Sequence, residues 1–224
     1  MKLFSYVVEH DDGHAPNPYF GTCTLCRCKY RKHPGGRRNV VELAKEAHER
    51  GEIVWVVGTG GADLRKSAGN GKLVYAMRVD EVLSRSKYYK DPRFAEKKPL
   101  ASGSYKEQQG DNVPPHGEFE RDEQYVLVSR HFYYFGKNAP DIPPVFPNLE
   151  KKGRGFRSRF EDTYIDRFVR WIETDKAGSR GEPCGKPSGT GACLAATKWH
   201  VEPSRRRCIG RKSRQRRKAC ESSC

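Results

Sequence analysis

The stretch IVWVVGTGG, residues 53–61, decides the fold. Its first five residues are β-branched or aromatic, which predicts a buried strand, and the glycines that follow predict a turn. Residues 39–50 (NVVELAKEAHER) come before it and have the pattern of a helix, with Asn39 as N-cap and Glu42 completing a capping box. Residues 72–83 (KLVYAMRVDEVL) come after it and predict a second long strand. A helix followed by two strands therefore forms the centre of the chain.

The same patterns predict the other elements on either side of this centre. Strands are expected at residues 2–9, 124–129 and 131–135, and helices at 84–94 and 163–174. Strand–helix–strand units do not repeat in series, so a doubly wound parallel sheet is not favoured. We expect an α+β domain of five or six short strands with two or three helices.

Positive charge is concentrated near the C-terminus. The chain carries 43 Lys and Arg against 28 Asp and Glu, a formal net charge of +15. Residues 178–224 hold 12 of these bases and 3 of these acids, so they supply +9 of the +15. Such a segment binds polyanions by releasing counterions and carries no sequence specificity of its own. We expect one domain over residues 1–177 and an irregular, basic, disordered tail over residues 178–224.

Apolar runs are short throughout the 224 residues. None approaches the ~20 apolar residues of a membrane span, and the apolar start of the chain is too short for a secretory signal. We therefore expect a cytoplasmic protein without membrane contact, whose eight cysteines are reduced thiols.

The segment after the first strand gathers polar side chains that suit a nucleobase. Asp12, Asn17 and Thr24 can hydrogen-bond a base edge, and Lys29 can contact a phosphate. Aromatic residues able to stack on a flipped or single-stranded base are Tyr19, Phe20 and Tyr75. The alternative is a set of local turns in which the Asp and Asn side chains only fold a proline-rich loop. Both interpretations stay open at this point.

The same segment contains residue types that bind zinc. The candidate ligands are Cys23, Cys26, Cys28, His10 and His14. Zn²⁺ prefers four nitrogen or sulfur ligands, so their number suffices, but the second Cys-x-x-Cys pair of common structural sites is missing. The alternative is that Cys23 and Cys28 are small buried residues beside a tight turn. We expect no cofactor, with zinc as the alternative.

Further candidates for ligand binding lie outside this segment. Gly58 opens a glycine run after a strand, but no Gly-Lys-Ser/Thr sequence follows, so turn glycines are favoured over a phosphate loop. Asp111 and Asn112 belong to a Gly-Asp-Asn triplet, which suits either a ligand or a turn. The phosphate-binding candidates are Lys97, Lys98, Arg154 and Arg157. Solvated surface charges are the competing interpretation for all four.

Several segments, taken in order, resemble the nucleotide modification associated domain 2 family of bacteria and phages. They are SYVVEHDDGHAPNPYFGTCTLCRCK (5–29), WVVGTGG (55–61), KLVYAMRVDEV (72–82), YYKDPRFAEKKP (88–99), GDN (110–112), FYYFGKNAPDIP (132–143), GRGFRSRF (153–160) and the closing amphipathic helix. The resemblance covers roughly residues 1–183. It departs at Cys26, where the family more often has a small residue, and in the longer, more charged segment 30–52.

The resemblance implies a domain found in systems that alter or handle modified bases, and it carries no established reaction. The strands also resemble the curled barrel of PUA-like domains, including the EVE and ASCH types, whose pockets accept bases or RNA. By this analogy the α+β domain is expected to be a curled, PUA-like mixed barrel or sheet.

The leading hypothesis is a binding module that recognises a nucleotide or modified base in a DNA-modification or phage-defence system. The base would enter between the 12–29 loop and the strands of Gly58 and Tyr75. The residues expected to line this site are Asp12, Asn17, Thr24, Cys28, Lys29, Gly58, Tyr75, Asp111 and Asn112. One alternative is an enzyme acting on a nucleotide or DNA base, with Asp12, His10 or Asp111 as acid or base. Another is a structural or partner-binding protein whose basic tail contacts nucleic acid without specificity.

Overall fold

The computed structural model describes residues 1–13, 15–25, 39–97, 125–153 and 155–185. The chain divides into two units, Met1–Ala192 and Cys193–Cys224, and all of the described residues belong to the first.

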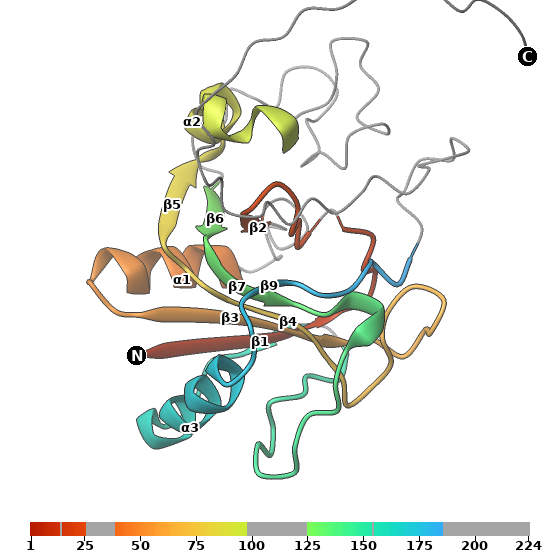
Figure 1. The fold of residues 1–224 in the computed structure, drawn as a ribbon. Coiled ribbons are helices and arrows are strands. Elements are labelled where there is room, and N and C mark those ends of the chain that lie inside the picture. Colours follow the sequence, from red (N-terminus) through yellow and green to blue (C-terminus); the bar gives the residue numbers. More distant parts are fainter. Residues whose placement is uncertain (14, 26–38, 98–124, 154, 186–224) are drawn as a thin grey trace, which may run out of the picture. The chain divides into compact units, whose positions relative to one another are not determined.

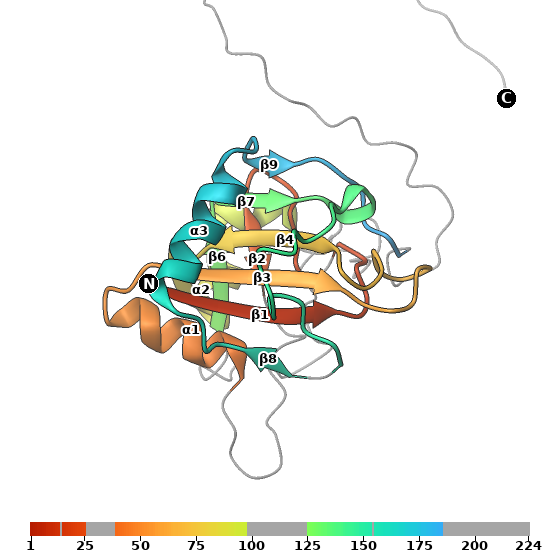
Figure 2. The ribbon, with the colours of Figure 1, turned by 90° about the horizontal axis from the view of Figure 1, so that it is seen from below.

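The largest element is a mixed six-stranded sheet in the order β8-β1-β3-β4-β7-β9 (Figure 2). Strands β1 and β3 are parallel neighbours, as are β7 and β9, whereas β3–β4, β4–β7 and β1–β8 are antiparallel. The strands span Phe156–Arg157 (β8), Lys2–Val8 (β1), Val54–Gly60 (β3), Leu73–Arg78 (β4), His131–Tyr134 (β7) and Gly178–Ser179 (β9).

A second, three-stranded antiparallel sheet has the order β2-β6-β5. Its strands span Cys23–Leu25 (β2), Tyr125–Ser129 (β6) and Glu81–Ser84 (β5). The α-helices span Val40–Glu49 (α1), Arg85–Lys90 (α2) and Asp162–Glu173 (α3), and the 3₁₀ helices span Pro92–Lys97 (η1) and Gly136–Asn138 (η3).

Both faces of the large sheet are covered. Helix α1 and the small sheet pack on one face, and α3 packs on the other (Figure 1). Side chains alternate between these faces along β3, so that Val54 and Val56 join the first core cluster while Trp55 and Val57 join the second. This double burial explains why residues 54–57 of β3 are apolar at every position rather than at alternate ones. A third cluster packs α2 and η1 against the outer face of the small sheet.

Both helices that flank the large sheet follow from local sequence. Asn39 accepts a hydrogen bond from the Glu42 N–H at 3.0 Å, and the Glu42 carboxylate accepts one from the Asn39 N–H at 2.9 Å. This is the predicted capping box, and it fixes the start of α1. In α3, at the predicted 163–174 helix, the side chains of Ile165, Phe168 and Ile172 are buried against the sheet, and residues at this spacing share one face of a helix.

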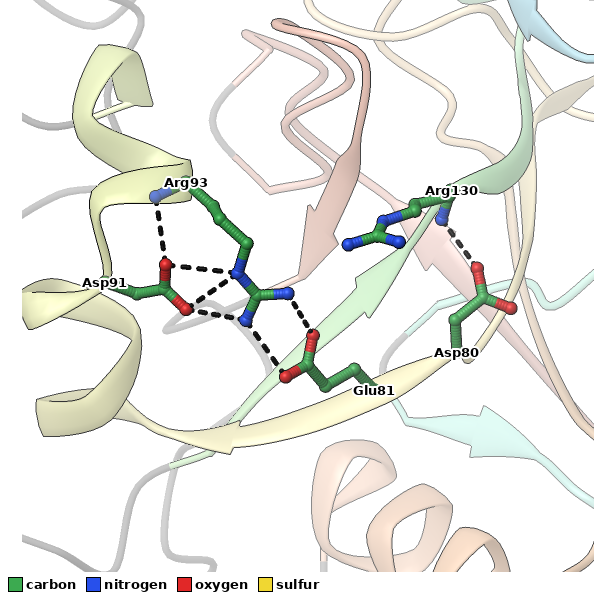
Figure 3. A network of polar contacts seen from close by, with 5 residues as sticks. All are labelled: Asp80, Glu81, Asp91, Arg93 and Arg130. Carbon is green, nitrogen blue, oxygen red and sulfur yellow. Dashed lines mark hydrogen bonds and ion pairs between the residues drawn. The ribbon is translucent and has the colours of Figure 1, made fainter.

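The two sheets are joined at a corner around Asp80. The Val79 N–H donates to Val54 O in the large sheet, and the next N–H, that of Asp80, donates to Val128 O in the small sheet. The Asp80 carboxylate accepts from the N–H of Arg130, at the point where β6 gives way to β7 (Figure 3). A paired ribbon, β4–β5 with β7–β6, therefore passes from one sheet to the other.

A neighbouring charge network ties η1 to the small sheet. The Arg93 guanidinium donates to both oxygens of Glu81 on β5 at 2.9 and 3.0 Å, and it also binds Asp91 (Figure 3). These groups are partly exposed, so each pair adds little stability by itself. The network fixes the direction in which the chain leaves α2.

The α+β class and the main elements agree with the sequence analysis, and three details differ. Residues 72–83 form two strands, β4 and β5, because the corner at Asp80 sends them into different sheets. Strand β2 lies inside a segment interpreted as loop. The described strands form two open sheets and no closed barrel.

The prediction of turn glycines after residue 57 is wrong. Strand β3 continues through Gly58 and Gly60. A side chain at Gly58 would clash with the Tyr75 ring and with Val8, and one at Gly60 would clash with the Gly69 carbonyl. These glycines are needed for close packing, not for a turn.

The described fold also continues beyond residue 177. Gly178 and Ser179, assigned to the tail from the sequence, form β9 and pair with Tyr133 and Tyr134. We call residues 178–185 the strap.

Candidate functional site

Two loops leave the large sheet at the same edge, because β1 and β3 are parallel and end side by side. Residues 9–22 connect β1 to β2 and are called the polar loop here; residues 61–72 connect β3 to β4. The Asp11 N–H donates to Lys66 O at 2.7 Å, and the Ser67 hydroxyl donates to Val8 O, so the two loops are joined. In open sheets, ligands bind beyond the carboxyl ends of parallel strands. The two loops at the carboxyl ends of β1 and β3 are therefore a candidate ligand site.

A buried lysine, Lys97, binds the polar loop through hydrogen bonds from its ammonium group. The Lys97 ammonium donates to Asn17 O (2.9 Å), Asn17 Oδ1 (3.0 Å), Thr22 O (3.0 Å) and Thr24 Oγ1 (3.4 Å). The lysine is 1% exposed, and Asn17 and Thr24 are fully buried. Asn17 and Thr24 also exchange two backbone hydrogen bonds at 2.9 Å. The loop is thereby closed into a fixed shape, and we call this arrangement the Lys97 anchor.

The anchored loop presents an aromatic side chain to solvent. Phe20 is 48% exposed and has a φ of +56°, a backbone conformation that costs energy for any residue except glycine. The Tyr19 N–H donates to Asn17 Oδ1, and the Tyr19 ring lies 6.3 Å from that of Phe20. Asp12, in the same loop, is partly exposed. The surface of the polar loop therefore combines an exposed ring with a carboxylate.

The polar loop also contains a buried carboxylate close to the end of β1. Asp11 is 1% exposed, and its Oδ1 accepts a hydrogen bond from the Tyr134 hydroxyl at 2.7 Å. Its Oδ2 accepts from the Cys184 N–H at 3.1 Å, and its main-chain oxygen accepts from the Gly185 N–H at 2.8 Å. Asp11 thus joins the end of β1, the end of β7 and the strap.

Burial sets the protonation behaviour of this cluster. It raises the pKa of Asp11 above the ordinary value, and the hydrogen bonds from Tyr134 and Cys184 offset part of that rise. Burial, and then the negative charge of Asp11, raise the pKa of the Cys184 thiol to about 12. The pKa of Tyr19 is raised by the same two causes. Clusters of shifted pKa values are a common mark of functional sites, although structural networks produce them too.

Close backbone contacts dock the strap beside Asp11. The Arg180 N–H donates to Tyr134 O, and the Lys137 N–H donates to Glu182 O, both at 2.8 Å. A side chain at Gly181 would clash with the Phe135 carbonyl, and one at Gly136 would clash with the Glu182 carbonyl. Two facing glycines therefore allow the strap to lie against the end of β7.

The structure brings three of the predicted site residues together. Asn17 and Thr24, predicted from one segment, and Lys97, predicted from another, meet in the Lys97 anchor. There Lys97, predicted to hold a phosphate, donates to protein oxygens instead. Gly58 and Tyr75 lie in the core, and the Tyr75 hydroxyl is 2.7 Å from that of Tyr6. The entry for a base between the 12–29 loop and these two strands stays a prediction, since residues 26–29 lie outside the described part of the chain.

The remaining predicted residues are spread more widely. Arg157 lies exposed on the edge strand β8. Cys23, the first residue of β2, is buried in the first core cluster, and the described residues contain no group of three or more side chains able to hold a metal. The candidates that lie outside the described residues are His14, Cys26, Cys28, Lys29, Lys98, Asp111, Asn112 and Arg154.

Comparison with known families decides the relationship of the chain. The model of nucleotide modification associated domain 2, Nmad2, matches residues 1–122 and 114–189. The chain belongs to the Nmad2 family. This confirms the resemblance found in the sequence and associates the chain with nucleotide modification. No curated protein and no solved structure gave a significant match. In the described part of this Nmad2 chain, no helix has the length and apolar character of a membrane span.

The Nmad2 match runs through the strap, since it extends to residue 189. Sequence reasoning missed this segment and the residue that binds it, Asp11. Both were overlooked because the hydrogen bonds that Asp11 accepts from Tyr134 and Cys184 span more than 120 positions, and no local pattern signals them. The Gly-Glu-Pro-Cys-Gly sequence at 181–185 has no apolar periodicity.

Proposed function

We propose that this Nmad2 domain recognises a modified base of a nucleic acid at the surface of the polar loop. Family membership supports an association with nucleotide modification, and the location at the ends of β1 and β3 supports ligand binding. The observation that carries the proposal is the Lys97 anchor together with the exposed Phe20 of the loop that it holds.

The anchor supports recognition because it gives a surface loop a fixed shape. Ordering a loop on binding lowers affinity, and a loop that is already ordered avoids that loss. Four oxygen atoms on Asn17, Thr22 and Thr24 converge on one ammonium group. The exposed ring of Phe20 therefore belongs to a loop whose shape is already fixed before binding.

Phe20 supplies the contact that a base needs. An exposed ring can stack on a splayed-out base, a contact worth about 1–3 kcal/mol. The partly exposed Asp12 lies in the same loop and can accept hydrogen bonds from the amino groups of a base. Residues 151–160 contain several basic side chains and no acidic ones. We propose that Lys151, Lys152 and Arg157 of this segment contact phosphates.

The proposal is tested with short single-stranded oligonucleotides that carry either a modified or an unmodified base. We expect Phe20→Ala to weaken binding of the modified strand about tenfold or more. A stacking contact is worth about 1–3 kcal/mol, and about 1.4 kcal/mol corresponds to a factor of ten in affinity. Fluorescence anisotropy measures the affinity. Val145→Ala, which shortens another half-exposed apolar side chain (52%), is the matched control.

Equal affinity of wild type and Phe20→Ala for the modified strand contradicts the proposal. Nucleoside mass spectrometry on the same mixtures tests the enzyme alternative, for which the buried Asp11–Tyr134 pair offers an acid or base. A new nucleoside that disappears with Asp11→Asn would place catalysis above recognition.

A further inference from the structure

Asp11 offers two hydrogen-bond acceptors at the edge of the sheet where a ligand is proposed to bind. They are Oδ2 and the main-chain oxygen, and both are occupied by the strap, through the consecutive N–H groups of Cys184 and Gly185. The other carboxylate oxygen, Oδ1, accepts a hydrogen bond from the hydroxyl of Tyr134 on β7. The strap therefore presents two neighbouring N–H donors to one buried residue.

The strap is attached mainly by backbone contacts, and Pro183 is the single buried side chain among its residues. No side chain of residues 178–185 belongs to any of the three core clusters formed by the described residues. The ion pairs of the strap, Lys137–Glu182 and Arg180–Asp175, are partly or largely exposed and add little. Segments with few buried apolar contacts open at low free energy, so the strap can detach while the sheets remain folded.

A ligand that replaces the strap must supply the same kind of donors. Leaving a buried carboxylate and a buried carbonyl without partners costs about the full desolvation of both groups. A base edge with a ring N–H beside an exocyclic amino group has the required pair. Guanine has this edge, whereas hypoxanthine has the ring N–H and lacks the amino group.

We propose that Asp11 is a base-reading acceptor for a guanine-type edge, and that Cys184 and Gly185 occupy its place until the ligand displaces them. This inference rests on the proposed function and specifies the base that it reads. The strap then acts as a resident competitor, and the apparent association constant equals the intrinsic one multiplied by the fraction of molecules in which the strap is undocked.

The test uses the full chain and a variant that undocks the strap. Gly181→Ala introduces a side chain that clashes with the Phe135 carbonyl, whereas Ser179→Ala changes the same segment without that clash. Guanosine monophosphate and inosine monophosphate are the probes, and isothermal titration calorimetry gives the affinities.

We expect Gly181→Ala to bind guanosine monophosphate at least tenfold more tightly than wild type and Ser179→Ala do. Inosine monophosphate is expected to gain much less, and adding Asp11→Asn to Gly181→Ala is expected to remove the gain. Unchanged affinity in a folded Gly181→Ala protein, or an equal gain for both nucleotides, overturns the inference.

A second measurement covers the case in which Gly181→Ala does not fold. In wild type, amide hydrogen exchange at Cys184 and Gly185 is expected to accelerate when guanosine monophosphate is added. Exchange that is unchanged or slower overturns the inference. If oligonucleotide binding still depends on Phe20 while these results are negative, the proposed function stands and only the role of the strap falls.

Discussion

Single residues far apart in the sequence give the candidate site its shape. Lys97 lies 80 positions from Asn17, yet its ammonium contacts both oxygens of that residue. A buried ammonium group is tolerated only where oxygen acceptors surround it. The anchor therefore ties the shape of the polar loop to a residue of η1.

Replacing Lys97 with Met keeps the length of the side chain and removes its donors. Oxygens of Asn17, Thr22 and Thr24 then lose a buried hydrogen-bond donor, so we expect the free energy of unfolding to fall by about 2–4 kcal/mol. Urea titration followed by circular dichroism measures the change. Lys90→Met, at an exposed lysine of α2, is the control and should change stability by less than about 0.5 kcal/mol. A similar result for both variants would mean that the anchor contributes nothing to folding.

The sequence predicted Asn17, Thr24 and Lys97 as site residues, although it did not predict that they bind one another. Their residue types indicated polar contacts, but a sequence pattern does not reveal which group provides the partner. Asp11 was missed for the same reason, since the choice between adjacent acids depends on which one faces Tyr134 across the sheet.

At the scale of elements, local signals predicted most of the secondary structure. The capping box of α1 and the apolar spacing of α3 act over one or two turns, and both are confirmed. Strand β2 has three residues and lies between turns, so it has no periodicity to detect. The division of residues 72–83 depends on the partners of Val79 and Asp80, which belong to different sheets.

The capping box makes a prediction for α1. Asn39→Ala removes the acceptor for the Glu42 N–H, and we expect it to destabilise the protein by about 1 kcal/mol. Asn39→Asp keeps an acceptor and is expected to cost only a few tenths of that amount. Thermal unfolding monitored by circular dichroism compares the two. Equal losses for both variants would show that the cap is not the cause.

At the scale of the whole molecule, charge and fold are separable. Residues 193–224 hold 10 Lys and Arg against 2 acids, so they supply +8 of the net charge of +15. The described sheets and helices all lie before residue 186. Affinity that arises from this extension should therefore be sensitive to salt and indifferent to the base that is read.

Deleting residues 193–224 tests this separation. We expect the midpoint of thermal unfolding to stay unchanged and the salt dependence of binding to unmodified duplex DNA to become shallower. The log–log slope should fall by about 0.9 for each phosphate that the shortened protein no longer neutralises. The preference for a modified strand should persist. Loss of all nucleic-acid affinity would mean that the folded domain is not the reader and would favour the alternative of a nonspecific basic tail.

The corner at Asp80 has a consequence for how the protein comes apart. Two paired strands cross it together, and one carboxylate accepts the N–H groups of both Arg130 and His131 there. Separating the three-stranded sheet from the six-stranded sheet would break the ribbon that supplies β5 and β6 to one and β4 and β7 to the other. The two sheets are thus expected to unfold in a single cooperative step. A destabilising substitution in either sheet should therefore lower the stability of both.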